Sequence, residues 1–117
     1  MRLFAALAVL ALPAVAQAED GKVLFAARCA ACHAAAAVKS GPVAPKIGGV
    51  AGRKIASLPD YAYSTALKGK GGQAWSDANL DAYLTAPAKF APGTKMFVGL
   101  PKLEERRAVI GYLKTLR

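Results

Sequence analysis

The sequence has few residues of the kinds that carry most protein chemistry. Its 117 residues include two cysteines, one histidine, two methionines and one tryptophan. Acidic residues number seven against sixteen basic ones. No stretch alternates apolar and polar side chains as a half-buried strand does, so we do not expect a β-sheet. With so few thiol and imidazole groups, the positions of those present decide which chemistry is open to the chain.

Long hydrophobic runs are also lacking, apart from one near the N-terminus. Arg2 precedes an apolar stretch from Leu3 to Leu12, and Ala16-Gln17-Ala18 follows it. A basic start, a short apolar run and a small-x-small tripeptide are typical of a secretory signal peptide. A membrane span needs about 20 apolar residues. We therefore predict a cleaved signal peptide at 1–18, a mature domain at 19–117 and a periplasmic location, with an uncleaved membrane anchor as the alternative.

Proline and glycine divide the remainder into helices and long loops. Breakers are dense at 34–54 and 89–100, so we expect loops there. The predicted helices span 21–31, 61–68, 77–85 and 102–116, with Asp20, Asp60 and Ser76 as caps for the first three. The predicted buried face of the third helix is Leu80, Tyr83 and Leu84. In the last helix a mostly apolar stripe consists of Leu103, Arg106, Val109, Ile110, Leu113 and Leu116. The sequence thus predicts an all-α domain of about four helices joined by long loops.

Both cysteines and the only histidine lie together in Cys29-Ala30-Ala31-Cys32-His33. Residues three apart share one face of a helix, so the two thiols would point the same way beside the imidazole. C-x-x-C-H is the attachment motif of c-type haem, in which two thiols bind the vinyl groups and the histidine binds iron. We predict one haem c attached covalently through Cys29 and Cys32, with His33 as a metal ligand.

Three other interpretations of this motif stay open. A thioredoxin-like redox pair would sit near a βαβ unit and would leave His33 without a role. A zinc site would need a carboxylate ligand as well, since zinc takes four ligands or three and a water. The motif could also arise by chance. A structural disulfide is disfavoured because a bridge across two residues closes too small a loop to stabilise a fold much.

A haem iron has a second axial position, for which histidine, methionine, lysine or no protein ligand are the candidates. His33 is the only histidine, and Met1 would leave with the signal peptide. Met96 is then the only thioether of the mature chain, in the loop Pro92-Gly93-Thr94-Lys95-Met96. We predict Met96 as the second metal ligand. Histidine and methionine together raise the reduction potential and leave no open iron site.

The order of the motifs resembles class I c-type cytochromes, above all bacterial cytochrome c2 and mitochondrial-type cytochrome c. The matching residues are Gly21, Phe25, Cys29, Cys32, His33, Pro45, Gly49, Gly52, Arg53, Lys54, Tyr61, Tyr63, Trp75, Asp81, Tyr83, Leu84, Pro87, Pro92 to Met96, Glu104 to Arg106 and Tyr112 to Lys114. The resemblance covers nearly all of the mature chain. It implies a single-haem fold in which four helices and long loops wrap around the cofactor.

The resemblance also implies roles for individual residues. The carbonyl of Pro45 would accept a hydrogen bond from His33, and Tyr83 would lie near the sulfur of Met96. Arg53, Tyr63, Trp75 and Thr94 would bind the haem propionates. Gly21 and Phe25 would meet the last helix near Val109, Ile110 and Tyr112. Tyr63, Trp75 and Tyr83 could instead be ordinary core aromatics, and Arg53 a surface residue.

The positive charge indicates acidic partner proteins. The formal net charge is +9, of which Arg2 contributes one, and no basic run exceeds two residues, so we do not expect nucleic-acid binding. We predict a monomeric one-electron carrier, not an enzyme and without a small-molecule substrate, that serves partners such as a bc1 complex, a terminal oxidase or a reaction centre. By resemblance, Arg28, Lys89, Lys95 and Lys102 would surround the haem edge. The alternatives are a dedicated cytochrome subunit of a dehydrogenase, or a haem peroxidase or ligand sensor with an open iron site.

Overall fold

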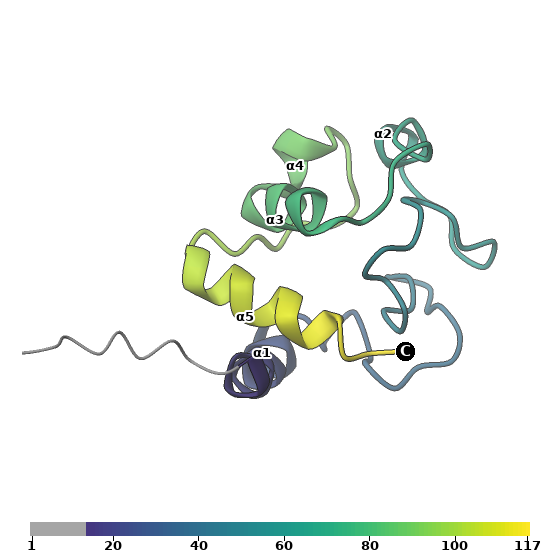
Figure 1. The fold of residues 1–117 in the computed structure, drawn as a ribbon. Helices are drawn as coiled ribbons and strands as arrows, with labels where there is room; N and C mark the ends of the chain where they lie inside the picture. Colours follow the sequence, from purple (N-terminus) through teal and green to yellow (C-terminus); the bar gives the residue numbers. More distant parts are fainter. Residues whose placement is uncertain (1–13) are drawn as a thin grey trace, which may run out of the picture.

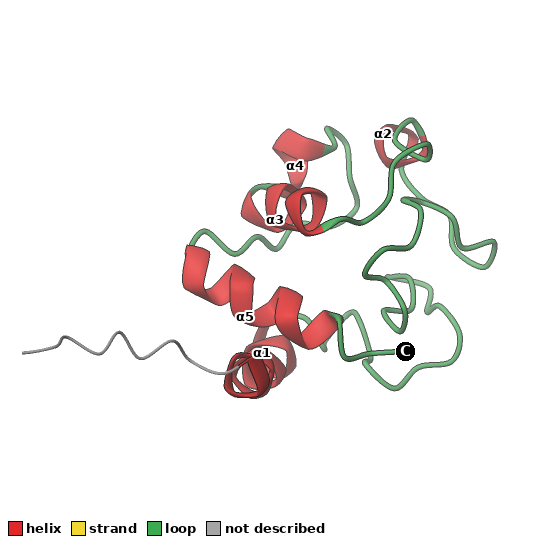
Figure 2. Cartoon of the chain, viewed as in Figure 1, coloured by secondary structure: helices red, strands yellow, loops and turns green. Residues whose placement is uncertain are grey.

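Helices and long loops make up the chain in the computed structural model, which describes residues 14–117 (Figure 1). The helices are α1 (Ala14–Arg28), α2 (Thr65–Lys68), α3 (Asp77–Thr85), α4 (Pro87–Phe90) and α5 (Leu103–Leu113). Figure 2 shows no strand in this range, where β-type pairing is limited to an isolated bridge between Lys54 and Ala74. The predicted all-α class is confirmed, with one short helix more than the four expected.

The first helix is longer at its start, and shorter at its end, than predicted. It begins at Ala14 instead of after Asp20, because the alanine-rich segment before Asp20 has high helix propensity. It ends at Arg28, and Cys29 to His33 form turns on its C-terminal end, where His33 N donates to Cys29 O at 2.9 Å. Residues 1–13 of the predicted signal peptide lie outside the described residues. Among the residues that are described, no helix is long and apolar enough to cross a membrane.

A close crossing of α1 and α5 forms one side of the core (Figure 1). Gly21 makes it possible, since a Cβ atom there would lie 1.9 Å from the carbonyl oxygen of Ala108. The rings of Phe25 and Tyr112 stand 5.4 Å apart across the same crossing. The expected contact between Gly21, Phe25 and the last helix is therefore present. This crossing fixes the end of α1 from which the C-x-x-C-H motif follows.

The third helix matches its prediction residue for residue. Ser76 caps it by accepting a hydrogen bond from Asn79 N at 3.1 Å. Leu80, Tyr83 and Leu84 are its buried residues, as their spacing predicted.

The ends of the other helices differ from the predictions for identifiable reasons. The cap of α2 is Ser64, because Asp60 instead accepts two hydrogen bonds from Ser40, at 2.7 and 2.9 Å. Pro87 follows the end of α3 and begins α4, since proline suits a first helical position. The second half of this helix occupies residues 89 and 90, where the sequence predicted a loop. The last helix stops at Leu113. Leu103 is 42% exposed and lies off the buried stripe.

Candidate haem-binding site

One cavity brings together all ten residues predicted to bind the cofactor or its metal. Its volume is about 270 Å³. The ten are Cys29, Cys32, His33, Pro45, Arg53, Tyr63, Trp75, Tyr83, Thr94 and Met96. Much of the remaining wall is apolar, and its side chains come from α1, α2, α3, α5 and the loop before α2. Examples are Phe25, Ile47, Leu67, Leu80 and Val109. A wider surface depression of about 1040 Å³ between α1, α3 and α5 contains none of the ten.

His33 is held in one tautomer at the cavity wall. Its Nδ1 lies 2.9 Å from the carbonyl oxygen of Pro45. A carbonyl can only accept, so Nδ1 carries the proton and Nε2 keeps its lone pair. Burial lowers the pKa of His33, and the bond to Pro45 offsets part of that effect. A neutral imidazole with a free Nε2 is the form that binds a metal.

The two thiols lie one helical turn apart and are both free. Cys29 is half-buried and packs against the core, whereas Cys32 is exposed. Burial raises the pKa of Cys29, and the neighbouring Arg28 opposes this. Both cysteines line the cavity, with unequal access to solvent.

Met96 reaches the cavity from a loop held by polar contacts. Tyr83 and Thr94 share a hydrogen bond of 2.6 Å between their hydroxyls. Thr94 Oγ1 also accepts from Met96 N at 3.4 Å. Gly93 has a φ of +85°, a left-handed conformation that favours glycine, and this turns the chain just before Thr94. Burial raises the pKa of Tyr83, so its hydroxyl stays protonated to a higher pH than that of an exposed tyrosine.

Arg53, Tyr63 and Trp75 form a more polar part of the wall. Arg53 donates to the carbonyls of Gly48 and Lys46, at 3.1 and 3.2 Å. Burial lowers its pKa, but a guanidinium stays protonated at neutral pH, and three of its five N–H donors remain for an anionic group. Trp75 packs against Tyr83, with ring centroids 5.1 Å apart. Thr94 lines the same cavity, and its hydroxyl is bonded to Tyr83; its contact with a propionate stays a prediction.

Two residues near this site, Lys95 and Ser40, make polar contacts that were not foreseen from the sequence. Lys95 Nζ donates to Ala62 O at 2.7 Å and lies 5.7 Å from the ring centroid of Tyr61. Ser40 Oγ accepts from Lys46 N at 3.0 Å while it donates to Asp60, which stabilises the turn that presents Pro45. Lys95 and Ala62 are 33 positions apart, and Ser40 and Asp60 are 20 apart, so no local sequence pattern predicts these two bonds.

The cavity fits a haem better than it fits the alternatives. Its apolar wall would bury a flat hydrophobic ring, two thiols lie on one side, and a neutral imidazole and a thioether reach it from separate loops. Zinc is disfavoured, because residues 14–117 contain no group of three histidine, cysteine, aspartate or glutamate side chains placed to hold a metal ion. The lack of strands in the same range removes the setting of a thioredoxin-like pair.

Comparison with known proteins gives a consistent result. The sequence model of the family described as cytochrome c matches residues 18–117. Cytochrome c type-1 of Ascaris suum is 43% identical over 99 residues, covering 82% of this chain and 85% of that protein. Cytochrome c2 of Afifella marina is 43% identical over 91 residues, covering 75% of this chain and 73% of that protein.

A solved structure agrees in fold as well as in sequence. Cytochrome cH from Methylobacterium extorquens superposes with a TM-score of 0.75 at 41% identity, covering 84% of this chain and 97% of that one. Members of the family carry one haem c bound through two cysteines, and this chain has two. The chain thus belongs to the cytochrome c family, as a class I electron carrier with one covalently bound haem c.

Proposed function

We propose that the chain is a periplasmic one-electron shuttle whose haem iron is bound by His33 and Met96. The observation that carries this proposal is the hydrogen bond of 2.9 Å from His33 Nδ1 to Pro45 O, which leaves Nε2 free within the cavity that Met96 also lines. Cys29 and Cys32 are the attachment points. When bound, haem c supplies an iron centre that gains and loses one electron.

The other residues of the cavity set the environment of that iron. The apolar wall excludes water, which favours the less charged reduced state and so raises the reduction potential. Arg53 offers free donors to a propionate, and Tyr63 and Trp75 line the same cavity. A buried carboxylate without such partners would be costly.

Acidic redox proteins, such as a bc1 complex, a terminal oxidase or a reaction centre, are the partners that the charge supports. Of the four cations expected around the haem edge, Arg28 and Lys95 line the cavity. The exposed ring of Phe97 lies at the same mouth and offers an apolar contact. Electron transfer to an acidic partner should slow as salt rises, because screening weakens the long-range attraction. Rates that stay flat between low and physiological salt would contradict this steering.

The test of the ligation is the visible spectrum of the holoprotein, with Met96→Ala as the variant. The wild type should show low-spin c-type bands, a weak red iron–sulfur band when oxidised, and no change of the reduced form with carbon monoxide. Met96→Ala should lose the iron–sulfur band and bind carbon monoxide. A wild-type protein that binds carbon monoxide readily would contradict methionine ligation and support an open-site enzyme or sensor.

A further inference from the structure

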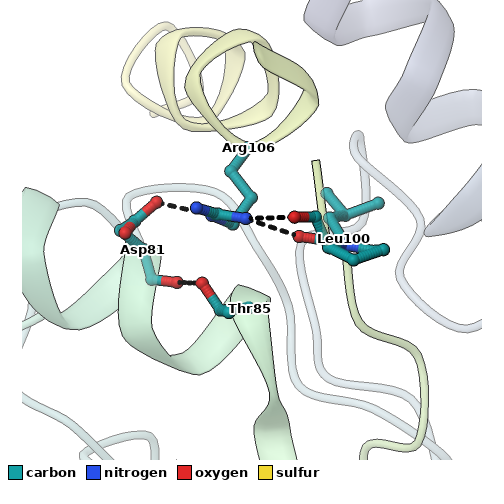
Figure 3. Close-up of polar contacts among 5 residues, drawn as sticks. Asp81, Thr85, Leu100 and Arg106 are labelled. Carbon is teal, nitrogen blue, oxygen red and sulfur yellow. Dashed lines mark hydrogen bonds and ion pairs between the residues drawn. The ribbon is translucent and has the colours of Figure 1, made fainter. Parts of the chain in front are cut away.

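Arg106 is a charged side chain buried in the first turn of α5. It is only 8% exposed. Its Nε donates to Asp81 Oδ1 at 2.7 Å, and its Nη1 donates to the carbonyls of Leu100 at 3.1 Å and Pro101 at 2.9 Å (Figure 3). A guanidinium in so buried a position is tolerated only when it is paired and hydrogen-bonded. These three hydrogen bonds are therefore what stabilises the buried guanidinium of Arg106.

The two carbonyls that Arg106 binds belong to the loop that carries Met96. This loop, residues 91–102, joins α4 to α5, and Leu100 lies near its C-terminal end. Leu100 is 1% exposed, and its N–H donates to Leu84 O of α3 at 2.6 Å. Its carbonyl has no helix or strand to satisfy it, and Arg106 supplies the donor. One residue of the loop is thus held by α3 through its N–H and by α5 through its carbonyl.

Met96 lies between Leu100 and a second attachment of the loop, at Thr94 and Lys95. At the other end of its segment, Thr94 is bonded to Tyr83 and Lys95 to Ala62 O. Between Met96 and Gly99 the side chains add little, because Phe97 is 91% exposed and Val98 is 46% exposed. Apart from the packing of Met96 itself on the core, its position therefore depends on the polar contacts at Thr94 and Lys95 and on those at Leu100 and Pro101.

We propose that Arg106 is a positioning residue for Met96, through its hold on Leu100 and Pro101. It keeps the C-terminal end of the loop on α3 and α5, so that the thioether stays in the cavity instead of swinging out. Asp81 orients the guanidinium from α3. The inference rests on the proposed His33 and Met96 ligation. Lysine would not replace arginine here, since the contacts need donors that diverge from one planar group.

The test is an imidazole titration of the oxidised holoprotein, because free imidazole takes the iron position only when Met96 leaves it. Arg106→Gln should increase the apparent affinity for imidazole by about tenfold or more, since loop opening costs less. Arg106→Lys should give a similar increase, and Asp81→Asn a smaller one. The matched control is Lys114→Gln, because Lys114 also pairs with α3, through Asp77 at 2.6 Å, but both partners are largely exposed. The control should stay within about twofold of the wild type.

Urea unfolding of the same variants separates positioning from a merely structural role. If Arg106→Gln lowers the unfolding midpoint but leaves imidazole affinity unchanged, Arg106 only docks α5 on α3 and the proposal is wrong. If the Arg106→Gln protein does not fold well enough to be purified, Asp81→Asn takes its place. This variant weakens the contact that orients the guanidinium but keeps the guanidinium itself.

Hydrogen exchange of the Leu100 amide tests whether Arg106 holds the loop, whatever the iron ligand is. In Asp81→Asn and Arg106→Gln the exchange rate of this amide should rise by about tenfold relative to that of the Val109 amide of α5. If the wild-type spectrum shows that Met96 is not a ligand, the ligation proposal fails and this exchange rate alone tests whether Arg106 holds the loop. Equal acceleration of Leu100 and Val109, or none, would overturn the inference.

Discussion

The two sides of the cavity are built on different principles. His33 follows directly from α1, within one turn of both thiols, and its backbone N–H bonds to Cys29 O. Only the contact with Pro45 comes from far along the chain. Met96 belongs to no helix, and the contacts that hold its loop come from α3, α5 and Ala62. One side is fixed by a local motif on a packed helix, the other by separate polar contacts, so the methionine side should be the side that opens.

The largest effect should come from damage to the packed helix on the histidine side. In Gly21→Ala the new Cβ would meet the backbone of Ala108 at 1.9 Å, and α1 and α5 would have to separate. We expect a loss of about 3 kcal/mol or more in the free energy of unfolding, measured with urea on the holoprotein.

The matched control for that variant is Gly111→Ala in α5, where a Cβ would meet no atom within 4 Å. It should stabilise the protein by up to about 1 kcal/mol, because alanine favours a helix over glycine. Equal stability of the two variants would mean that the crossing is not as tight as described.

A smaller effect should follow from removing one contact on the methionine side. Tyr83→Phe deletes the hydrogen bond to Thr94. The buried Thr94 hydroxyl then keeps only the long contact of 3.4 Å with Met96 N. We expect a loss of about 1–2 kcal/mol in unfolding free energy and tighter imidazole binding to the oxidised protein. Tyr61→Phe is the control, since its hydroxyl bonds Val43 O at an exposed site. Imidazole binding unchanged from the wild type would contradict a role for Tyr83 in holding the loop.

The same tyrosine gives a prediction at high pH. Burial raises the pKa of Tyr83 above its usual value of 10.0. Between pH 10.0 and the higher pKa of the folded state, Tyr83 loses its proton in the unfolded chain but keeps it in the folded one. The free energy of unfolding therefore falls as pH rises through this range. Part of the decline measured by urea unfolding between pH 9 and pH 11 should disappear in Tyr83→Phe. A decline identical in both proteins would assign it to other groups.

The smallest effect should come from weakening the contact between Asp60 and Ser40, which stabilises the turn that presents Pro45 to His33. Hydrogen bonds from the side chain and backbone of Ser40 hold the pKa of Asp60 below its usual value of 3.8. The ionised carboxylate therefore stabilises the fold above pH 3.8, and this stabilisation is lost as pH falls through the lower folded value. Asp60→Asn should be slightly less stable than the wild type at pH 7, with the difference shrinking in acid.

Ser40→Ala provides the cross-check for that prediction, since it removes the hydroxyl that donates to Asp60. It keeps the backbone N–H of Ser40 as a donor to Asp60, and it also removes the acceptor of the Lys46 N–H. The double variant should lose less stability than the sum of the two single losses, because both changes remove the bond between the Ser40 hydroxyl and Asp60. Fully additive losses would contradict a contribution of that bond.

Sequence reasoning succeeded where the determining interactions are local. Ser76 and the apolar spacing of Leu80, Tyr83 and Leu84 define α3 within a few residues, and α3 was predicted without error. The C-x-x-C-H motif and the loop before Met96 named residues that the structure brings into one cavity. Their roles toward the haem remain predictions until the spectra are measured.

Long-range pairs account for what the sequence did not reveal. Asp60 looked like a helix cap but pairs with Ser40, twenty positions earlier, so the cap of α2 moved to Ser64. Arg106 looked like one residue of an otherwise apolar stripe, and nothing near it in the sequence pointed to Asp81. Such partners are chosen by the fold, and they can be named only once the fold is known.

The crossing of α1 and α5 also constrains the order of events during synthesis. Gly21 and Phe25 find their packing partners on α5, which is synthesised after the other four helices of the described residues. Until α5 exists, the end of α1 has no core against which to bury the side chains around Cys29. Until α5 packs on α1, both thiols and His33 therefore follow a helix that is not yet held in the core, where they are accessible to covalent modification.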